Sequence, residues 1–154
     1  MTTNNPLPTV QRMFEAFAKG DVDRLLETVH PDSRWTYVGA NPRPAKRLYV
    51  GRKDVRKFFG KIIQNLTITT FHPTEFVTEN DTVVVIGFES GIITATGHPF
   101  RNEWVQKYVV RDDLITEMEE YNIQVNTTPR QLKCFEGLSA QMKGPVRNQG
   151  GFDE

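Results

Sequence analysis

Patterns typical of helices are concentrated in the first part of this chain, and patterns typical of strands fill the part that follows. Apolar residues recur at three- and four-residue steps in residues 6–18, 21–29 and 52–65, which predicts three amphipathic helices. From residue 67 to residue 125, apolar residues mostly alternate with polar ones, as they do in half-buried strands. Helices followed by a mostly antiparallel sheet predict an α+β fold, in which the helices cover one face of a single sheet.

Each predicted helix has one apolar stripe, and the first two have recognisable ends. Pro6 suits the first turn of the first helix, Gly20 suits its end, and Asp21 suits the N-cap of the second. The stripes consist of Leu7, Val10, Met13, Phe14 and Phe17, then Val22, Leu25, Leu26 and Val29, then Val55, Phe58, Phe59, Ile62 and Ile63.

The extended segments are separated by turn-forming residues. The predicted strands are residues 33–38, 47–50, 67–76, 82–88, 90–96, 100–110 and 114–125. His30 and Pro31 break the pattern before the first strand, a loop is expected at 40–46, and Gly51 closes the second strand. Residues 79–81 and 111–113 are expected to form turns.

Length and composition favour one compact domain with a substantial core. The chain has 154 residues, of which 38% are hydrophobic and 10% aromatic. Nineteen basic and nineteen acidic side chains give zero formal charge, so we expect no nucleic-acid partner and no membrane partner. Residues 1–7 lack the pattern of a signal peptide, and the single cysteine, Cys134, allows no internal disulfide, so a cytoplasmic protein is expected.

Several catalytic motifs have no counterpart in the sequence. The glycines do not form a phosphate-binding loop, and no serine lies in a nucleophile elbow. His30, His72 and His98 are too scattered to resemble a helical metal-binding motif. We therefore expect no metal site and no cofactor, and a reaction that requires only proton transfers.

Aromatic and hydrogen-bonding residues are concentrated on one face of the predicted sheet. They are Trp35, Tyr37, Asn102, Trp104, Gln106, Tyr108, Met118, Glu120 and Asn122. Mixed linings of this kind are typical of small-molecule cavities, although Trp and Tyr are also common in half-buried sheets. In the last strand, alternation groups Glu120 with Thr116, Met118 and Asn122, and groups Glu117 and Glu119 with Ile115 and Tyr121. Glu120 is therefore the candidate acid, and alternation alone leaves open whether its face of the strand points to water or to a cavity.

Three stretches in order resemble the nuclear transport factor 2-like superfamily, in its branch of ketosteroid isomerase-related and SnoaL-like polyketide cyclase proteins. They are VQRMFEAFAKGDVDRLLETVHPDSRW at residues 10–35, YVGRKDVRKFF at 49–59 and HPFRNEWVQKYVVRDDLITEMEEYN at 98–122. The resemblance implies a cystatin-like fold, a cone-shaped α+β barrel with three N-terminal helices on a strongly curved sheet that encloses a pocket. It also implies a homodimer in many members. The expected domain spans residues 1–126, followed by an extension at 127–154 with a short helix near 131–142.

The resemblance does not carry the ketosteroid isomerase mechanism to this chain. The positions of its oxyanion-binding tyrosine, its general base and its second aspartate are occupied here by Met13, Tyr37 and Gln106. Cyclase and epoxide hydrolase relatives instead place a carboxylate on the last strand, and that position is Glu120. The arginine of the epoxide hydrolases has a possible counterpart in Arg101, within a segment of uncertain register at 101–103.

Three readings of Glu120 remain open from the sequence. In the first, the protein is an isomerase, cyclase or hydrolase in which Glu120 and Tyr37 act on a small hydrophobic carbonyl or polyketide-like molecule. In the second, the same pocket binds a hydrophobic ligand without turnover, or the module serves dimerisation. In the third, Glu120 only forms an ion pair with Arg34 or Arg101. The predicted substrate-binding residues are Met13, Phe17, Trp35, Tyr49, Phe59, Trp104, Gln106, Tyr108, Met118 and Asn122.

Overall fold

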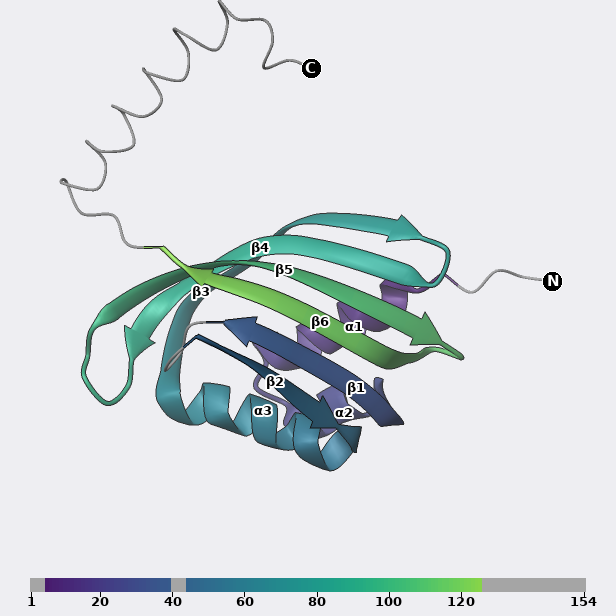
Figure 1. The fold of residues 1–154 in the computed structure, drawn as a ribbon, viewed down its shortest axis with the longest axis horizontal. Helices are drawn as coiled ribbons and strands as arrows, with labels where there is room; N and C mark the ends of the chain where they lie inside the picture. The colour runs from purple at the N-terminus through teal and green to yellow at the C-terminus, as the bar shows by residue number, and fades with distance from the viewer. Residues whose placement is uncertain (1–4, 40–43, 126–154) are drawn as a thin grey trace, which may run out of the picture.

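The computed structural model describes residues 5–39 and 44–125, in which three helices lie on one side of a curled, open sheet (Figure 1). The helices are α1 (Leu7–Ala18), α2 (Val22–Leu26) and α3 (Gly51–Asn65). The strands are β1 (Val29–Gly39), β2 (Ala45–Val50), β3 (Leu66–Glu79), β4 (Thr82–Ile93), β5 (Pro99–Arg111) and β6 (Leu114–Gln124). This arrangement confirms the predicted α+β class.

The sheet has the strand order β2-β1-β6-β5-β4-β3. All neighbouring strands are antiparallel except β1 and β6, which run parallel and pair Trp35 with Met118 and Tyr37 with Glu120. The first and last parts of the described chain therefore meet in the middle of the sheet.

The helix predictions are confirmed to within a few residues. The side chain of Asp21 caps α2 by accepting a hydrogen bond from the backbone N–H of Arg24 at 3.0 Å. Gly51 does not close β2 but is the first residue of α3. No helix in residues 5–39 and 44–125 has the length and apolar character needed to cross a membrane.

Two strand boundaries differ from the prediction, because residues that the sequence pattern places between strands lie inside strands of this sheet. β1 begins at Val29 and includes His30 and Pro31. Its pairing with β6 is irregular between Val29 and Arg34, so the proline, which lacks an N–H, interrupts no regular ladder. The strands predicted at 82–88 and 90–96 are one strand, β4, whose pairing with β5 runs without a shift from Thr82 to Ile92.

The loop predicted at 40–46 is shorter than expected, because β2 begins at Ala45. Residues 40–43 lie outside the described residues, as do Cys134 and the extension predicted for residues 127–154.

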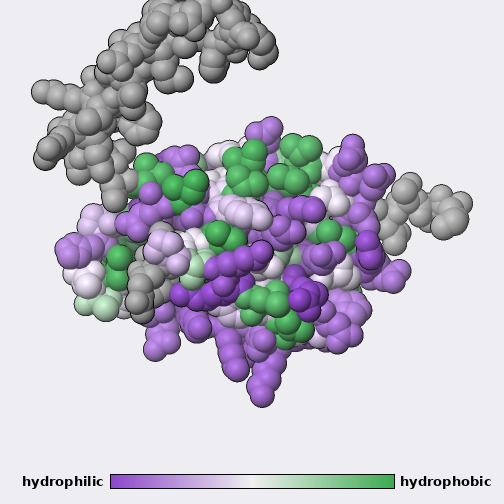
Figure 2. Space-filling model, in the orientation of Figure 1, coloured by the Kyte–Doolittle hydropathy of each residue, from purple (hydrophilic) through white to green (hydrophobic). Residues whose placement is uncertain are grey.

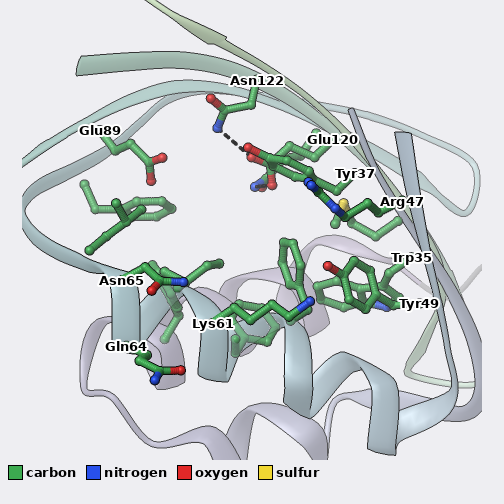
Figure 3. A pocket seen from close by; sticks show the side chains of 18 of the residues that line it. Trp35, Tyr37, Arg47, Tyr49, Lys61, Gln64, Asn65, Glu89, Glu120 and Asn122 are labelled. Carbon is green, nitrogen blue, oxygen red and sulfur yellow. Dashed lines mark hydrogen bonds between the residues drawn. The ribbon is translucent and has the colours of Figure 1, made fainter. Parts of the chain in front are cut away.

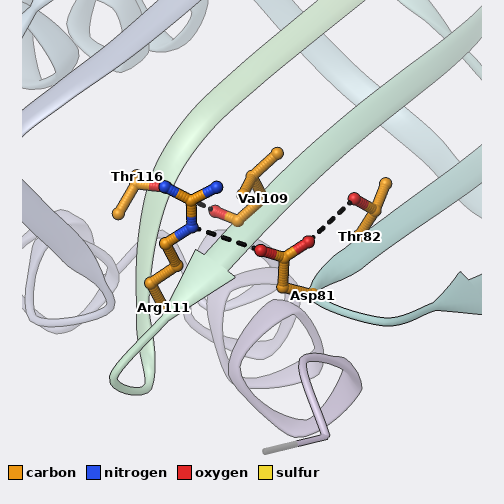
Figure 4. A network of polar contacts seen from close by, with 5 residues as sticks. All are labelled: Asp81, Thr82, Val109, Arg111 and Thr116. Atoms are coloured by element: carbon orange, nitrogen blue, oxygen red, sulfur yellow. Dashed lines mark hydrogen bonds and ion pairs between the residues drawn. The ribbon is translucent and has the colours of Figure 1, made fainter.

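A bulge in the β5–β6 hairpin corrects the predicted face of Ile115. The pairing register shifts between Val109 and Val110, and Thr116 donates its hydroxyl to the carbonyl of Val109 at 3.2 Å (Figure 4). Because one extra residue reverses the alternation, Ile115 is fully buried on the same face as Met118. Arg111 and Asp81 form an ion pair at 3.2 Å that connects this hairpin to the start of β4.

The core fills the space between the helices and the inner face of the sheet. Val10, Leu25, Val55 and Ile115 are among its fully buried members. Part of the space near α1 and α3 is not filled by side chains, and that part forms the cavity described next.

Candidate functional site

A cavity of about 830 Å³ lies between the inner face of the sheet and helices α1 and α3. This is large enough for a small organic molecule. All but one of the predicted site residues line it, namely Met13, Phe17, Trp35, Tyr37, Tyr49, Phe59, Gln106, Tyr108, Met118, Glu120 and Asn122. The lining is mostly aromatic, with polar groups concentrated on the sheet.

Trp104 is the predicted residue that lies outside the cavity lining. Its ring is buried, and it stacks on Phe71 and Phe14 with ring centroids 5.3 and 6.3 Å apart. Gly87 opposite leaves the room for the indole, since a Cβ there would lie 2.5 Å from the ring. Trp104 therefore supports Phe14 and Phe71, which do line the cavity.

Four side chains form a row across neighbouring strands at the polar end of the cavity. Arg47 on β2 pairs with Tyr37 on β1, Tyr37 pairs with Glu120 on β6, and Glu120 pairs with Gln106 on β5. Each strand exposes every second residue to the inner face, so the register alone brings these groups together. Tyr37 leans over Gly39, where any side chain would clash with the phenol.

Glu120 accepts a hydrogen bond on each carboxylate oxygen. Nε2 of Gln106 donates to Oε1 at 2.9 Å. Nδ2 of Asn122 donates to Oε2 at 2.8 Å, as the dashed line in Figure 3 shows. The hydroxyl of Tyr108 donates to Oε1 of Gln106 at 2.7 Å, which orients the amide toward Glu120. No ion pair among the described residues includes Glu120, and the nearest partner of Arg101 is Glu103 at 3.7 Å. The structural ion pair that the sequence left open for Glu120 is therefore wrong.

Burial dominates the electrostatics of this end of the cavity. Glu120 is 7% exposed, and burial, reinforced by the charge of Glu89, raises its pKa to about 7 against the opposing effect of the two amides. Burial and the nearby Glu120 also raise the pKa of Tyr37 and of Tyr108 above the ordinary phenol value. Both tyrosines are consequently neutral hydrogen-bond donors at neutral pH, while Glu120 exchanges its proton there.

Glu89 is a second buried acid in the cavity that the sequence reading missed. It lies on β4, is 9% exposed and accepts a hydrogen bond on Oε2 from Nδ2 of Asn102 at 2.9 Å. Burial raises its pKa as well. Residue 89 falls in the gap between the strands predicted at 82–88 and 90–96, although its alternation with Val83, Val85 and Gly87 signals an inward side chain.

The rim of the cavity carries two cationic residues that the sequence reading also left out. Arg47 and Lys61 both line the cavity, and the Lys61 ammonium lies 5.9 Å from the centre of the Tyr49 ring.

The register of residues 101–103 is now defined. Asn102 points inward and is buried, whereas Arg101 and Glu103 are exposed on the outer face. The guanidinium of Arg101 lies 4.2 Å from the centre of the Phe88 ring. Arg101 is therefore not the counterpart of an epoxide hydrolase arginine. Within the described part of the chain, no group of three or more His, Cys, Asp or Glu side chains could hold a metal ion.

Comparisons with known proteins agree with this architecture. The family described as SnoaL-like domain matches residues 10–118. An NTF2-like protein from Burkholderia xenovorans is 26% identical, with a TM-score of 0.69. The alignment covers 79% of this chain and 92% of that protein. TerC co-crystallised with polyporic acid is 20% identical, with a TM-score of 0.63, over 75% of this chain and 89% of its own. A protein with a ketosteroid isomerase-like fold from Catenulispora acidiphila, in complex with trimethylamine, is 19% identical, with a TM-score of 0.60. The alignment covers 73% of this chain and 83% of that protein. Among proteins with curated descriptions, none matches the chain.

Proposed function

The chain belongs to the SnoaL-like domain family of the nuclear transport factor 2-like superfamily, and from that premise we propose that it is a proton-transfer enzyme for small hydrophobic carbonyl compounds. The observation that carries the proposal is the buried carboxyl of Glu120, held by two amides at the polar end of an aromatic cavity. The reaction class is isomerisation or cyclisation: a C–H bond beside a carbonyl is broken, and the enolate then forms a new C–H bond in an isomerisation or a new C–C bond in a cyclisation.

In this proposal the carboxylate of Glu120 removes a proton from the carbon next to the carbonyl. Tyr37 lies opposite Glu120 on the neighbouring strand, and its neutral phenol donates a hydrogen bond to the enolate oxygen that develops. Gln106 and Asn122 each direct an N–H at Glu120, so their part is to position that carboxylate rather than to bind the enolate.

The walls of the cavity favour a flat, ring-containing substrate. Trp35, Phe58 and Phe59 contact one another with ring centroids between 5.2 and 6.1 Å apart, and Phe17 adds a further ring. Such surfaces bind aromatic or conjugated rings by burial and stacking. Polyporic acid in the TerC crystals is consistent with this class of ligand, although the sequence identity of 20% transfers the fold alone.

The rate of proton abstraction is expected to rise with pH and to level off near pH 7. Only the carboxylate form of Glu120 acts as a base, and that form is dominant above a pKa of about 7. The rate should therefore increase about tenfold per pH unit below that value and stay constant above it. Deuterium uptake by β-tetralone in D₂O, followed by mass spectrometry with buffer-catalysed exchange subtracted, measures this. A protein-dependent rate that is flat from about pH 5 upward would indicate a carboxylate with an ordinary pKa and contradict the proposal.

A second candidate is a binding protein without turnover, and the largely aromatic lining favours it. It predicts that a native mass spectrum of freshly purified protein contains an unaltered hydrophobic ligand, and that the protein does not accelerate exchange in any flat ketone. Accelerated exchange would exclude this candidate as the whole function.

We also propose that two copies pair through the outer face of the sheet. Figure 2 shows separate apolar patches among hydrophilic residues on the face that it presents. Ile86, Val105 and Tyr121 lie side by side on three neighbouring strands and are exposed. Lys107 and Glu119, paired across β5 and β6 beside this row, offer opposite charges that a two-fold partner can match.

Val105→Lys is expected to convert a dimer into a monomer, because it places a charge in the centre of the proposed interface. Light scattering coupled to size-exclusion chromatography measures the mass of each species. Ile63→Lys is the matched control, since Ile63 is also an exposed β-branched apolar residue but lies on α3. A wild-type protein that elutes as a monomer at high concentration would contradict the dimer.

A further inference from the structure

Arg47 and Lys61 place two positive charges on one side of the cavity, and the proposed reaction assigns no role to either. Arg47 is half-buried on β2, and Lys61 is exposed near the end of α3. Both line the cavity, and Figure 3 shows Lys61 extending toward Tyr49, while Glu89 lies on the side opposite Arg47. The cavity therefore has a cationic side and an acidic side.

Two tyrosines lie close to the two cations. The Lys61 ammonium is 5.9 Å from the centre of the Tyr49 ring, and Tyr49 follows Arg47 by two residues on the same face of β2. Burial and Glu120 raise the pKa of Tyr37, and the nearby charge of Arg47 opposes that rise. A guanidinium, an ammonium and two phenols, all of which can donate hydrogen bonds, thus share one side of the cavity.

An anionic group on a ligand suits this side of the cavity better than a neutral one. A guanidinium can donate two parallel hydrogen bonds to a carboxylate, and hydrogen bonds between charged groups are stronger than neutral ones. Because Arg47 is half-buried beside aromatic walls, water and salt screen its charge less than they screen a charge on the surface. Lys61 forms no ion pair with another of the described residues, so no fixed partner competes with a ligand for its ammonium.

The register of the sheet determines how such a ligand is oriented. Arg47 pairs with Tyr37, and Tyr37 pairs with Glu120, so the backbones of Arg47 and Glu120 are two strand spacings, or about 10 Å, apart. A carboxylate beside Glu120 or Glu89 would meet a like charge, whereas beside Arg47 it meets an opposite one. The ligand therefore points its anionic end at Arg47 and its uncharged end at the acids.

We propose that the ligand of this cavity is a flat ring compound with a carboxylate, which Arg47 and Lys61 bind at the end of the molecule remote from Glu120. The inference rests on the proposed function for the position of the reacting carbon. It deepens the substrate class from hydrophobic carbonyl compounds to carbonyl compounds that also carry a carboxylate.

Two ligands of nearly the same shape isolate the contribution of the charge. 2-Naphthoate carries a carboxylate at pH 7, and 2-naphthamide replaces it with a neutral group of similar size. Isothermal titration calorimetry at low salt measures the dissociation constant of each. We expect the wild-type protein to bind the carboxylate about tenfold more tightly than the amide, and added salt to weaken this preference.

Arg47→Gln is expected to remove most of the preference, and Lys61→Met to reduce it about threefold, because an exposed charge contributes less. The readout is a ratio of two affinities of one variant, so a general loss of binding does not imitate the effect. Lys46→Gln and Lys57→Met are the matched controls. Each removes one positive charge from the same strand or helix, but neither residue lines the cavity, so both should retain the wild-type preference.

Equal binding of the two ligands by the wild-type protein, or binding of neither, would overturn the inference. A preference that survives in both Arg47→Gln and Lys61→Met, or that falls as far in the controls, would overturn it as well. β-Tetralone has no carboxylate, so wild-type protein that exchanges its α-hydrogens but shows no preference for 2-naphthoate would leave the proposed function intact. A clear preference without any exchange would instead support the ligand class and contradict the proposed function.

Discussion

Glu120→Gln is expected to slow α-hydrogen exchange in β-tetralone by about 10²- to 10⁴-fold, the usual contribution of a positioned proton-transfer group. The glutamine amide has nearly the size of the carboxyl group, but it cannot accept a proton from carbon near neutral pH. The exchange rate at pH 8 or above, where wild-type Glu120 is ionised, gives the clearest comparison because its pKa is about 7.

Glu119→Gln provides the control for this change. Glu119 is the preceding residue on β6, but its side chain lies on the other face and accepts a hydrogen bond from the exposed hydroxyl of Tyr121 at 3.2 Å. It should therefore retain the wild-type rate. If Glu120→Gln exchanged as fast as Glu119→Gln while remaining folded, Glu120 would not be the base.

Trp104→Ala is expected to lower the free energy of unfolding by about 3–5 kcal/mol, because it removes a large buried ring and leaves a cavity between Phe14 and Phe71. Trp104→Phe should cost much less, under about 1.5 kcal/mol, since it fills most of the space with another ring. The indole Nε1 of Trp104 is buried without a hydrogen-bond partner in the described residues, so phenylalanine breaks no hydrogen bond. Urea denaturation of the two variants measures the difference.

Trp35 offers the contrasting case for the same substitution. Its Nε1 donates to the hydroxyl of Ser33 at 2.9 Å, and both residues are buried. Trp35→Phe therefore leaves Ser33 without this partner and should cost about 1–3 kcal/mol beyond the loss of packing. Equal costs for Trp104→Phe and Trp35→Phe would show that the hydrogen-bonding state of the indole does not matter here.

Local patterns predicted most of the fold because they depend on nearest neighbours along the chain. The stripe of α1 and the N-cap at Asp21 are examples. The errors arose where pairing with a distant strand decided the outcome. β4 continues through Glu89 because β5 supports it without a shift, and Ile115 turns inward because Thr116 is an extra residue opposite Val109.

The cavity acid Glu120 could be predicted because alternation in a strand fixes which side chains share a face. Its neighbours could not all be predicted in the same way. Arg47 reaches the cavity only through the strand order of the sheet, and Trp104 shares the inner face but lies behind Phe71 instead of beside the cavity. Alternation predicts which face of the sheet a side chain lies on. Whether that side chain touches the cavity or lies behind another side chain depends on packing.

The parallel pairing of β1 with β6 also governs when the site can form. Tyr37 and Glu120 are brought together by a pairing that spans most of the described chain, and such long loop closures are slow steps in folding. During synthesis, β6 leaves the ribosome after every other strand of the sheet. Until then, the edge of β1 that pairs with β6 has no partner strand. The nascent chain is therefore most prone to aggregation immediately before β6 pairs with β1. Because β6 also carries Glu120, the same strand completes both the sheet and the proposed active site.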